Sequence, residues 1–170
     1  MKRLALLRHA KSSWDDADLD DFDRPLNDRG WKAARRIGRE FTHRGMRFDL
    51  VLASTAARVR HTIDGVQENF ELDCPIRFDR QVYLASEELL LRLVRDLDER
   101  VERPLLVGHN PGLEQLLARL TSDDDRLAGR GAQNLPTCAF ARIELPVHRW
   151  AELQPGSGKI LELILPKDLD

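Results

Sequence analysis

Short apolar runs alternate with longer amphipathic stretches, and this order constrains the fold of the chain more than any other feature. The runs LALL (4–7), FDLVLAS (48–54) and RPLLVGH (103–109) have the length and apolar character of strands buried on both faces. After each of them comes a segment whose apolar residues recur at helical spacing. This alternation predicts an α/β fold, a three-layer αβα sandwich with a mainly parallel central sheet.

Cap residues mark the starts of four predicted helices, and two further strands are expected at 139–145 and 159–165 after an acidic, glycine-containing loop (121–136). Glu87 and Glu88 suit the positive end of the third helix. The predicted caps are Asn27, Ser54 or Thr55, Ser86, and Asn110 followed by Pro111 at the first helical position.

Length and charge limit the classes of function. A chain of 170 residues, 42% of them apolar, predicts one domain over residues 1–170. The net charge of −2 gives no basic surplus, so neither nucleic acid nor a membrane is expected as a partner. Cys74 and Cys138 fit no metal-binding spacing, and no signal peptide or membrane-spanning run is visible. We therefore expect reduced thiols and a cytoplasmic location.

Cationic residues and histidines follow three of the predicted strands. Arg8 and His9 follow the first, ASTAARVRHT (53–62) the second and GHNPG (108–112) the later one. Ligands of open α/β sheets bind where the carboxyl ends of the strands converge. Arginines, histidines and helix N-termini at one such edge favour a phosphoryl group. Arg58, in the first turn of its helix, can reach back over this edge with a guanidinium.

The two histidines of these segments, His9 and His109, cannot both be explained as phosphate clamps. A neutral imidazole among arginines is a good nucleophile toward phosphorus, because the cations suppress its protonation and neutralise the incoming charge. We expect His9 to attack and His109 to donate a hydrogen bond to the phosphoryl oxygens. For His61, packing against a neighbour and a role in the site remain open, and Arg60 is expected in solvent.

Three motifs resemble those of a known family. LLRHAKSSW (6–14) resembles the Arg-His-Gly signature of the histidine phosphatase superfamily, with Ala10 in place of the glycine. STAARVRHT (54–62) is similar to its Ser-x-x-x-Arg-x-x-x-Thr segment, and GHNP (108–111) to its second histidine motif. DRPLNDRG (23–30) and LPTCAFA (135–141) make the chain most similar to the SixA-type phosphohistidine phosphatases.

The resemblance implies a phosphoglycerate mutase-like fold and a phosphoenzyme on His9, with Arg8, Arg58 and His109 around the phosphoryl group. Water would then hydrolyse the intermediate, and no metal or organic cofactor is expected. A phosphorylated protein or a small phosphorylated metabolite is the expected partner.

Ser12, Arg24 and Asn110 are the expected substrate-binding residues. Arg24 could instead pair with the neighbouring aspartates, and Ser12 belongs to a polar loop that needs such residues in any case. Trp14 lies near enough in sequence to contact a substrate.

A dedicated general acid is hard to identify. Glu87 and Glu88 are better explained as residues of a helix start, and the aspartates of WDDADLDDFD (14–23) as a solvated loop. An alkoxide leaving group needs a proton, whereas imidazole, with a pKa of roughly 6.5, leaves readily. A site without an acid therefore favours phosphohistidine or another labile phosphate.

Other functions remain as alternatives. They are a broad small-molecule phosphomonoesterase, a metal-dependent phosphohydrolase, a phosphomutase and a non-catalytic module that binds phosphorylated partners. A metal-dependent phosphohydrolase is disfavoured because the sequence contains no HxH, HxD or HExxH pairing.

Overall fold

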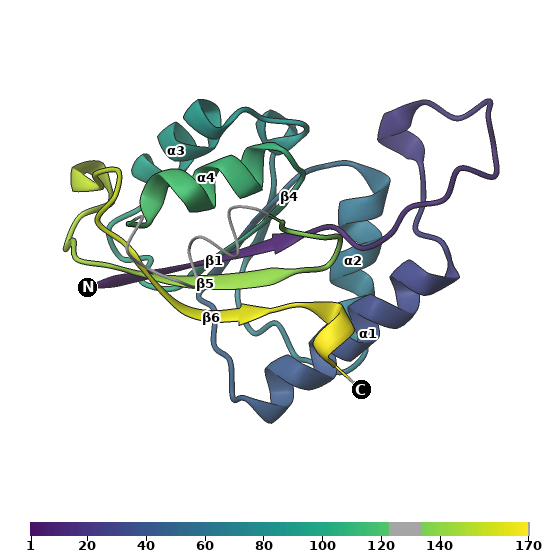
Figure 1. Cartoon of the computed structure of the whole chain (residues 1–170), viewed down its shortest axis with the longest axis horizontal. Helices are drawn as coiled ribbons and strands as arrows, with labels where there is room; N and C mark the ends of the chain where they lie inside the picture. Colours follow the sequence, from purple (N-terminus) through teal and green to yellow (C-terminus); the bar gives the residue numbers. More distant parts are fainter. Residues whose placement is uncertain (123–133, 170) are drawn as a thin grey trace.

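A six-stranded sheet forms the centre of the computed structural model, which describes residues 1–122 and 134–169 (Figure 1). The order across the sheet is β3-β2-β4-β1-β5-β6. The strands β3, β2, β4 and β1 are parallel, and β5 and β6 extend the sheet by antiparallel pairing. The bounds are β1 (Lys2–Arg8), β2 (Leu50–Ala53), β3 (Ile76–Phe78), β4 (Pro104–Gly108), β5 (Phe140–Leu145) and β6 (Lys159–Ile164).

Helices cover both faces of this sheet. The first pair, α1 (Asp28–His43) and α2 (Ala57–Gln67), packs on one face, and α3 (Glu87–Arg95) with α4 (Gly112–Leu120) on the other. Side chains of a strand point alternately to the two faces, so Leu4 and Leu6 of β1 pack under α3 and α4, while Ala5 and Leu7 pack under α1 and α2. The predicted αβα sandwich with a mainly parallel sheet is confirmed.

Local details differ from the sequence prediction in three places. The strand β3 was not predicted, because three half-buried or exposed residues give no periodic signal. Asn27 and Ser86 cap α1 and α3 as expected, accepting hydrogen bonds from Gly30 N and Leu89 N. Neither Ser54 nor Thr55 caps α2, however, since Ala56 occupies the cap position.

The start of α4 is shifted by one residue from the prediction. Pro111 is the cap rather than the first helical residue, and Asn110 precedes it. The Asn110 side chain still serves the first turn, because its Oδ1 accepts a hydrogen bond from Glu114 N (3.2 Å). Most of the predicted loop at 121–136, residues 123–133, lies outside the described residues.

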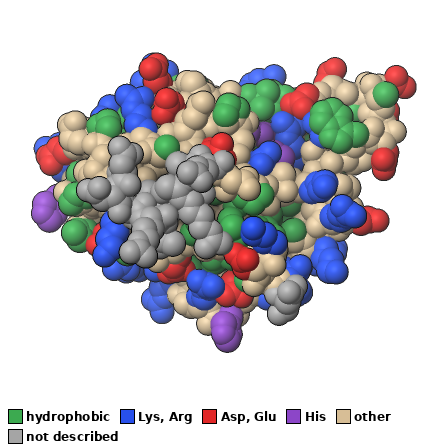
Figure 2. Space-filling view, in the orientation of Figure 1, with side chains coloured by type: hydrophobic (Ala, Val, Ile, Leu, Met, Phe, Trp, Pro, Cys, Tyr) green, Lys and Arg blue, Asp and Glu red, His purple; other side chains and the backbone are tan. Residues whose placement is uncertain are grey.

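On the face drawn in Figure 2, basic and acidic side chains are interspersed, in keeping with the small net charge. No helix in the described ranges combines the length and apolar character needed to cross a bilayer.

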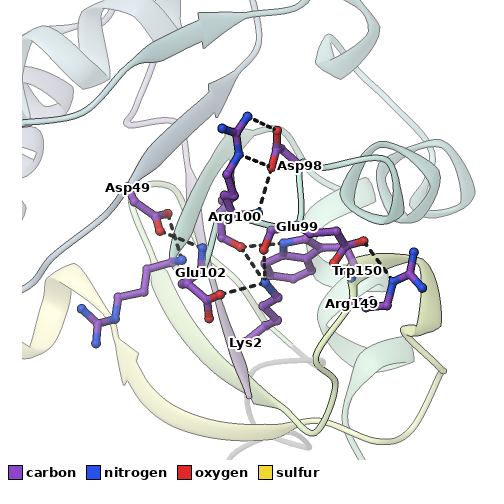
Figure 3. A network of polar contacts seen from close by, with 10 residues as sticks. Lys2, Asp49, Asp98, Glu99, Arg100, Glu102, Arg149 and Trp150 are labelled. Carbon is purple, nitrogen blue, oxygen red and sulfur yellow. Dashed lines mark hydrogen bonds and ion pairs between the residues drawn. The ribbon is translucent and has the colours of Figure 1, made fainter.

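A buried lysine, Lys2, connects the beginning of β1 to the segment before β4, the two strands that His9 and His109 directly follow (Figure 3). Lys2 Nζ donates to the carbonyl oxygens of Glu99 (2.5 Å) and Val101 (3.1 Å) and to Glu102 Oε1 (3.0 Å), all in the segment before β4. The indole Nε1 of Trp150 donates to the same Val101 carbonyl (2.8 Å). These contacts help to hold β1 and β4 in the register that pairs Arg8 with Gly108 at the opposite edge.

Candidate active site

The carboxyl ends of β1, β4 and β2 meet at one edge of the sheet. The backbone N–H of His9 donates to Gly108 O (3.0 Å), and that of Ser54 donates to Val107 O (3.1 Å). The imidazole rings of His9 and His109 consequently lie with their centroids 5.3 Å apart. The three predicted segments therefore do come together.

A hollow of about 390 Å³ opens over this edge. All seven residues predicted to be catalytic or substrate-binding line it, together with five others. The lining residues are Arg8, His9, Lys11, Ser12, Trp14, Asp21, Arg24, Arg58, Leu84, His109, Asn110 and Thr137.

His9 is buried and carries its proton on Nδ1. That nitrogen lies 2.6 Å from the carbonyl oxygen of Ala10, which can only accept a hydrogen bond. The lone pair is thus on Nε2. Burial is the main cause that lowers the pKa of His9 to about 4; the hydrogen bond to Ala10 O acts in the opposite direction, and the guanidiniums of Arg58 and Arg8 add to the lowering. At neutral pH the ring is an uncharged nucleophile.

His109 has the complementary arrangement. Its Nε2 lies 2.8 Å from Ser54 Oγ, and the same oxygen accepts a hydrogen bond from Ala56 N (3.2 Å). Among the described residues, Nε2 is the acceptor in contact with the Ser54 hydroxyl, so we assign the hydroxyl proton to this contact, which places the imidazole proton on Nδ1. Nδ1 is buried and has no hydrogen-bond partner among the described residues. It is a donor available to a ligand.

Burial also keeps His109 uncharged. Desolvation, followed by the effects of His9 and Arg58, lowers its pKa to about 3. Ser54, interpreted from the sequence as a helix cap, is thus a site residue that fixes the tautomer of this ring. Its place in the Ser-x-x-x-Arg-x-x-x-Thr segment was the available signal.

The two arginines of the site are held by different partners. Arg8 Nη1 donates to Leu135 O (3.1 Å), while its buried Nε has no partner among the described residues. Burial lowers the pKa of Arg8 from its usual value. Arg58 is buried and donates through Nη1 to Asp21 O (2.7 Å) and through Nη2 to Asp21 Oδ2 (3.0 Å).

Asp21 is a second site residue that the sequence reasoning did not single out. Its carboxylate also accepts from Tyr83 Oη (2.5 Å) and Arg24 Nη1 (2.9 Å). Desolvation alone would raise its pKa, but the hydrogen bonds from Tyr83, Arg58 and Arg24 together lower it to about 2. Asp21 therefore stays ionised and is unsuited to protonate a leaving group.

Arg24 is placed both to contact a substrate and to pair with a neighbouring aspartate, the two alternatives that the sequence left open. It lines the hollow, and it pairs with Asp21 while donating to Ser13 O (3.0 Å) and Ser12 Oγ (2.5 Å). Asn110 is occupied in a different way: its Nδ2 donates to Leu135 O (2.8 Å), the carbonyl that also accepts from Arg8. Its amide thus holds the wall of the hollow.

The loop after β1 is anchored by its neighbours. Thr62 Oγ1 accepts from Ala10 N (2.9 Å) and donates to Arg58 O (2.6 Å), which links the first motif to the second. On the other side, the start of α1 packs directly against Lys11. A Cβ at Gly30 would lie 2.1 Å from Lys11 O, so only glycine allows this approach.

Several other candidates lie outside the hollow. Glu87 and Glu88 occupy the first turn of α3 and do not line it. Arg60 is exposed, with its guanidinium 4.0 Å from the Phe78 ring centre, and His61 stacks on Trp31 at 5.2 Å. Within the described ranges, no three metal-ligating side chains cluster as a metal site would require.

Comparison with known proteins agrees with the family resemblance of the sequence motifs. Residues 4–82 match the histidine phosphatase superfamily (branch 1). An uncharacterised protein of Mycobacterium tuberculosis is 30% identical over 164 residues, covering 95% of this chain and all of that one. An uncharacterised chloroplastic protein of Arabidopsis thaliana is 28% identical over 178 residues, covering 97% of this chain and 78% of that one.

Solved structures extend the comparison to the whole fold. A protein of Agrobacterium tumefaciens, described as the "putative phosphohistidine phosphatase SixA", has a TM-score of 0.82 and 31% identity, covering 97% of this chain and 98% of that one. The protein histidine phosphatase SixA complexed with tungstate has a TM-score of 0.81 at 20% identity, with 99% of each chain covered. The family match and the structural similarity together show that the chain belongs to the histidine phosphatase superfamily. This fold supports the activity of a hydrolase that removes phosphoryl groups.

Proposed function

We propose that this protein hydrolyses a labile phosphate, with phosphohistidine in a protein as the first candidate, through a covalent intermediate on His9. The observation that carries the proposal is the state of His9: a buried, uncharged imidazole whose Nδ1 proton is bound by Ala10 O, facing a hollow lined by arginines. The similarity to the Agrobacterium SixA protein supports it.

In the first step, the lone pair of His9 Nε2 forms a bond to phosphorus. The bond between phosphorus and the leaving group breaks, and the leaving group departs with that electron pair. The guanidiniums of Arg8 and Arg58 neutralise the charge on the phosphoryl oxygens, and the Nδ1–H of His109 donates to one of them. Positioned charge supplies most of what phosphoryl transfer requires.

In the second step, water attacks phosphorus and the bond to Nε2 breaks. The electron pair returns to the imidazole, inorganic phosphate leaves, and the proton from water passes to phosphate or solvent. Nδ1 keeps its proton throughout, so the hydrogen bond to Ala10 O orients the ring and stabilises the positive charge that it carries while phosphorylated.

The absence of an identified acid among the lining residues determines the substrate class in this proposal. Asp21 is ionised, with a pKa of about 2, and Glu87 and Glu88 lie outside the hollow. A leaving imidazole needs little help, because its conjugate acid has a pKa of roughly 6.5. Phosphohistidine or another labile phosphate fits such a site better than a sugar phosphate, which requires protonation of an alkoxide.

The proposal has further parts. Residues 1–170 act as one histidine phosphatase domain without a metal or organic cofactor. The protein works in the cytoplasm on a phosphorylated protein or a small phosphorylated metabolite, with Ser12, Arg24 and Asn110 forming or supporting the substrate-binding wall.

A turnover screen tests this function. Phosphohistidine peptides, acyl phosphates and sugar phosphates are compared under the same conditions, and the protein is quenched to trap phosphate that is labile in acid and stable in base. We expect the labile substrates to be preferred and the trapped phosphate to disappear in His9→Ala. Wild-type turnover by His9→Ala would refute the intermediate. A preference for sugar phosphates would select the phosphomonoesterase alternative, and loss of activity in chelator with recovery on added metal would select a metal enzyme.

A further inference from the structure

Apolar side chains are exposed around the mouth of the hollow. Trp14 and Leu84, which both line it, are 77% and 54% exposed, and Leu19, on the same loop as Trp14, is 39% exposed. Met1 is the only other large hydrophobic side chain exposed in the described ranges. Two of the four therefore line the hollow and a third lies on the loop that carries Trp14, which is typical of a contact surface rather than of scattered surface residues.

Two of these side chains are held in their exposed positions. The Arg24 guanidinium stacks on Trp14, 3.2 Å from the ring centre, while its nitrogens bind Ser12, Ser13 and Asp21. Leu84 has φ of 49°, a left-handed conformation unfavourable for a leucine. It directly follows Tyr83, whose hydroxyl binds Asp21. Arg24 thus holds the indole at the rim, and the Tyr83–Asp21 hydrogen bond anchors the residue that precedes Leu84.

The loop that carries Trp14 and Leu19 is strongly acidic. It projects from the body of the molecule between β1 and α1, and acidic and hydrophobic side chains share that corner of the surface (Figures 1 and 2). Asp21 is engaged in the site, but the other aspartates of the loop form no ion pair within the described ranges. These exposed residues are Asp15, Asp16, Asp18, Asp20 and Asp23.

An acidic rim beside an anion-binding hollow disfavours the approach of a free small phosphate. The rim repels an approaching anion, although Lys11 in the hollow and Arg80 against Phe22 offset part of this field. The same rim attracts a positively charged surface and steers it toward the hollow. The exposed indole then finds apolar contact on the partner.

We propose that Trp14, Leu84 and the aspartates of residues 15–20 form a docking rim for a protein whose phosphohistidine is surrounded by lysine or arginine side chains. This inference rests on the proposed function and narrows its substrate from labile phosphates in general to a basic surface of a partner protein. An anionic membrane does not fit, because it would meet the same repulsion as a small phosphate.

Binding of two peptides tests the rim without relying on turnover. Both carry a non-hydrolysable phosphonate isostere of phosphohistidine at the centre, one flanked by lysines and the other by glutamates, and fluorescence anisotropy gives the two Kd values. We expect the basic peptide to bind roughly tenfold more tightly, and this ratio to shrink at about 0.5 M salt, where screening is nearly complete beyond a few ångströms.

Matched variants separate the rim from the overall charge of the protein. Asp15→Asn/Asp16→Asn/Asp18→Asn should reduce the ratio at least threefold, whereas Glu71→Gln/Asp73→Asn/Glu152→Gln, equal in charge and exposed elsewhere, should leave it unchanged. Trp14→Ala should weaken binding of both peptides.

Equal affinity for the two peptides, or equal effects of the two triple variants, would overturn the proposal. Turnover of the corresponding phosphohistidine peptides is measured separately, so a protein that fails to hydrolyse them refutes the proposed function without deciding the charge preference.

Discussion

Removing the hydroxyl of Ser54 should impair the chemistry more than its small size suggests. Ser54→Ala deletes the 2.8 Å contact to His109 Nε2 in a fully buried environment and leaves that nitrogen without a partner. An unsatisfied buried polar group costs about 1–3 kcal/mol. For a domain of this size, each kcal/mol lowers Tm by roughly 2–4 °C, so we expect a decrease of about 4–8 °C for a loss near 2 kcal/mol.

The same substitution should slow turnover. Without Ser54, nothing directs the proton of His109 to Nδ1, and molecules with the proton on Nε2 lack the donor proposed to contact the phosphoryl group. A loss of about 1.4 kcal/mol in transition-state stabilisation corresponds to roughly tenfold in kcat. Nitrogen NMR of the labelled imidazole reports the tautomer directly.

Ser86→Ala is the matched control for this experiment. It removes the hydroxyl that caps α3, a loss of about 1 kcal/mol, but it lies outside the hollow and should leave kcat unchanged. Our reasoning would be refuted if Ser54→Ala kept wild-type kcat while NMR showed that the proton had moved to Nε2.

Three further predictions follow from the site. Because the pKa of His9 is lowered to about 4, kcat/KM on a labile substrate should hold as the pH falls from 7 to about 5 and have its acidic midpoint near 4; a midpoint near 6.5 would contradict this. The pKa values of His9 and His109 are lower in the folded protein than in the unfolded chain, so the free energy of unfolding falls as the pH drops below about 6.5, by up to about 1.4 kcal/mol per pH unit for each ring. In denaturant unfolding, His9→Asn should lose less of this free energy per pH unit than wild type. Asp21→Asn removes a negative charge but keeps the backbone carbonyl that binds Arg58, so inorganic phosphate should inhibit several-fold more strongly; unchanged inhibition would count against the electrostatic role of Asp21.

The strand-end residues could be predicted because their placement follows from topology. Once β1, β2 and β4 are recognised as parallel strands, their carboxyl ends must share an edge, and Arg8, His9 and His109 must meet there. Arg58 follows from its position in the first turn of α2. The histidine roles depend on chemistry rather than on local structure, so they could be proposed before any coordinates.

Ser54 and Asp21 could not be found in the same way, because their contacts are long-range. Ser54 reaches a ring 55 positions away, whereas a serine before a helix is usually a cap. Asp21 is one of six aspartates between residues 14 and 23, and composition does not distinguish them. Only the short 3-10 turn at Asp21–Asp23 places this one against Arg58 and Tyr83. The strand β3 was missed for a simpler reason, since IRF is too short to show a period.

The charges of the hollow balance in a way that explains why both histidines must be neutral. Apart from the exposed Lys11, the charged residues that line the hollow are Arg8, Arg24 and Arg58, with three positive charges, and Asp21, with one negative charge, so their sum is 3 − 1 = +2. A phosphoryl group carries a charge of about −1.5 to −2 at neutral pH and therefore nearly cancels it. A protonated His9 would raise the charge to +3 and would also lose the lone pair that attacks. Burial thus has two effects: it holds the imidazole in its reactive form, and it leaves the electrostatic attraction for phosphate to the guanidiniums.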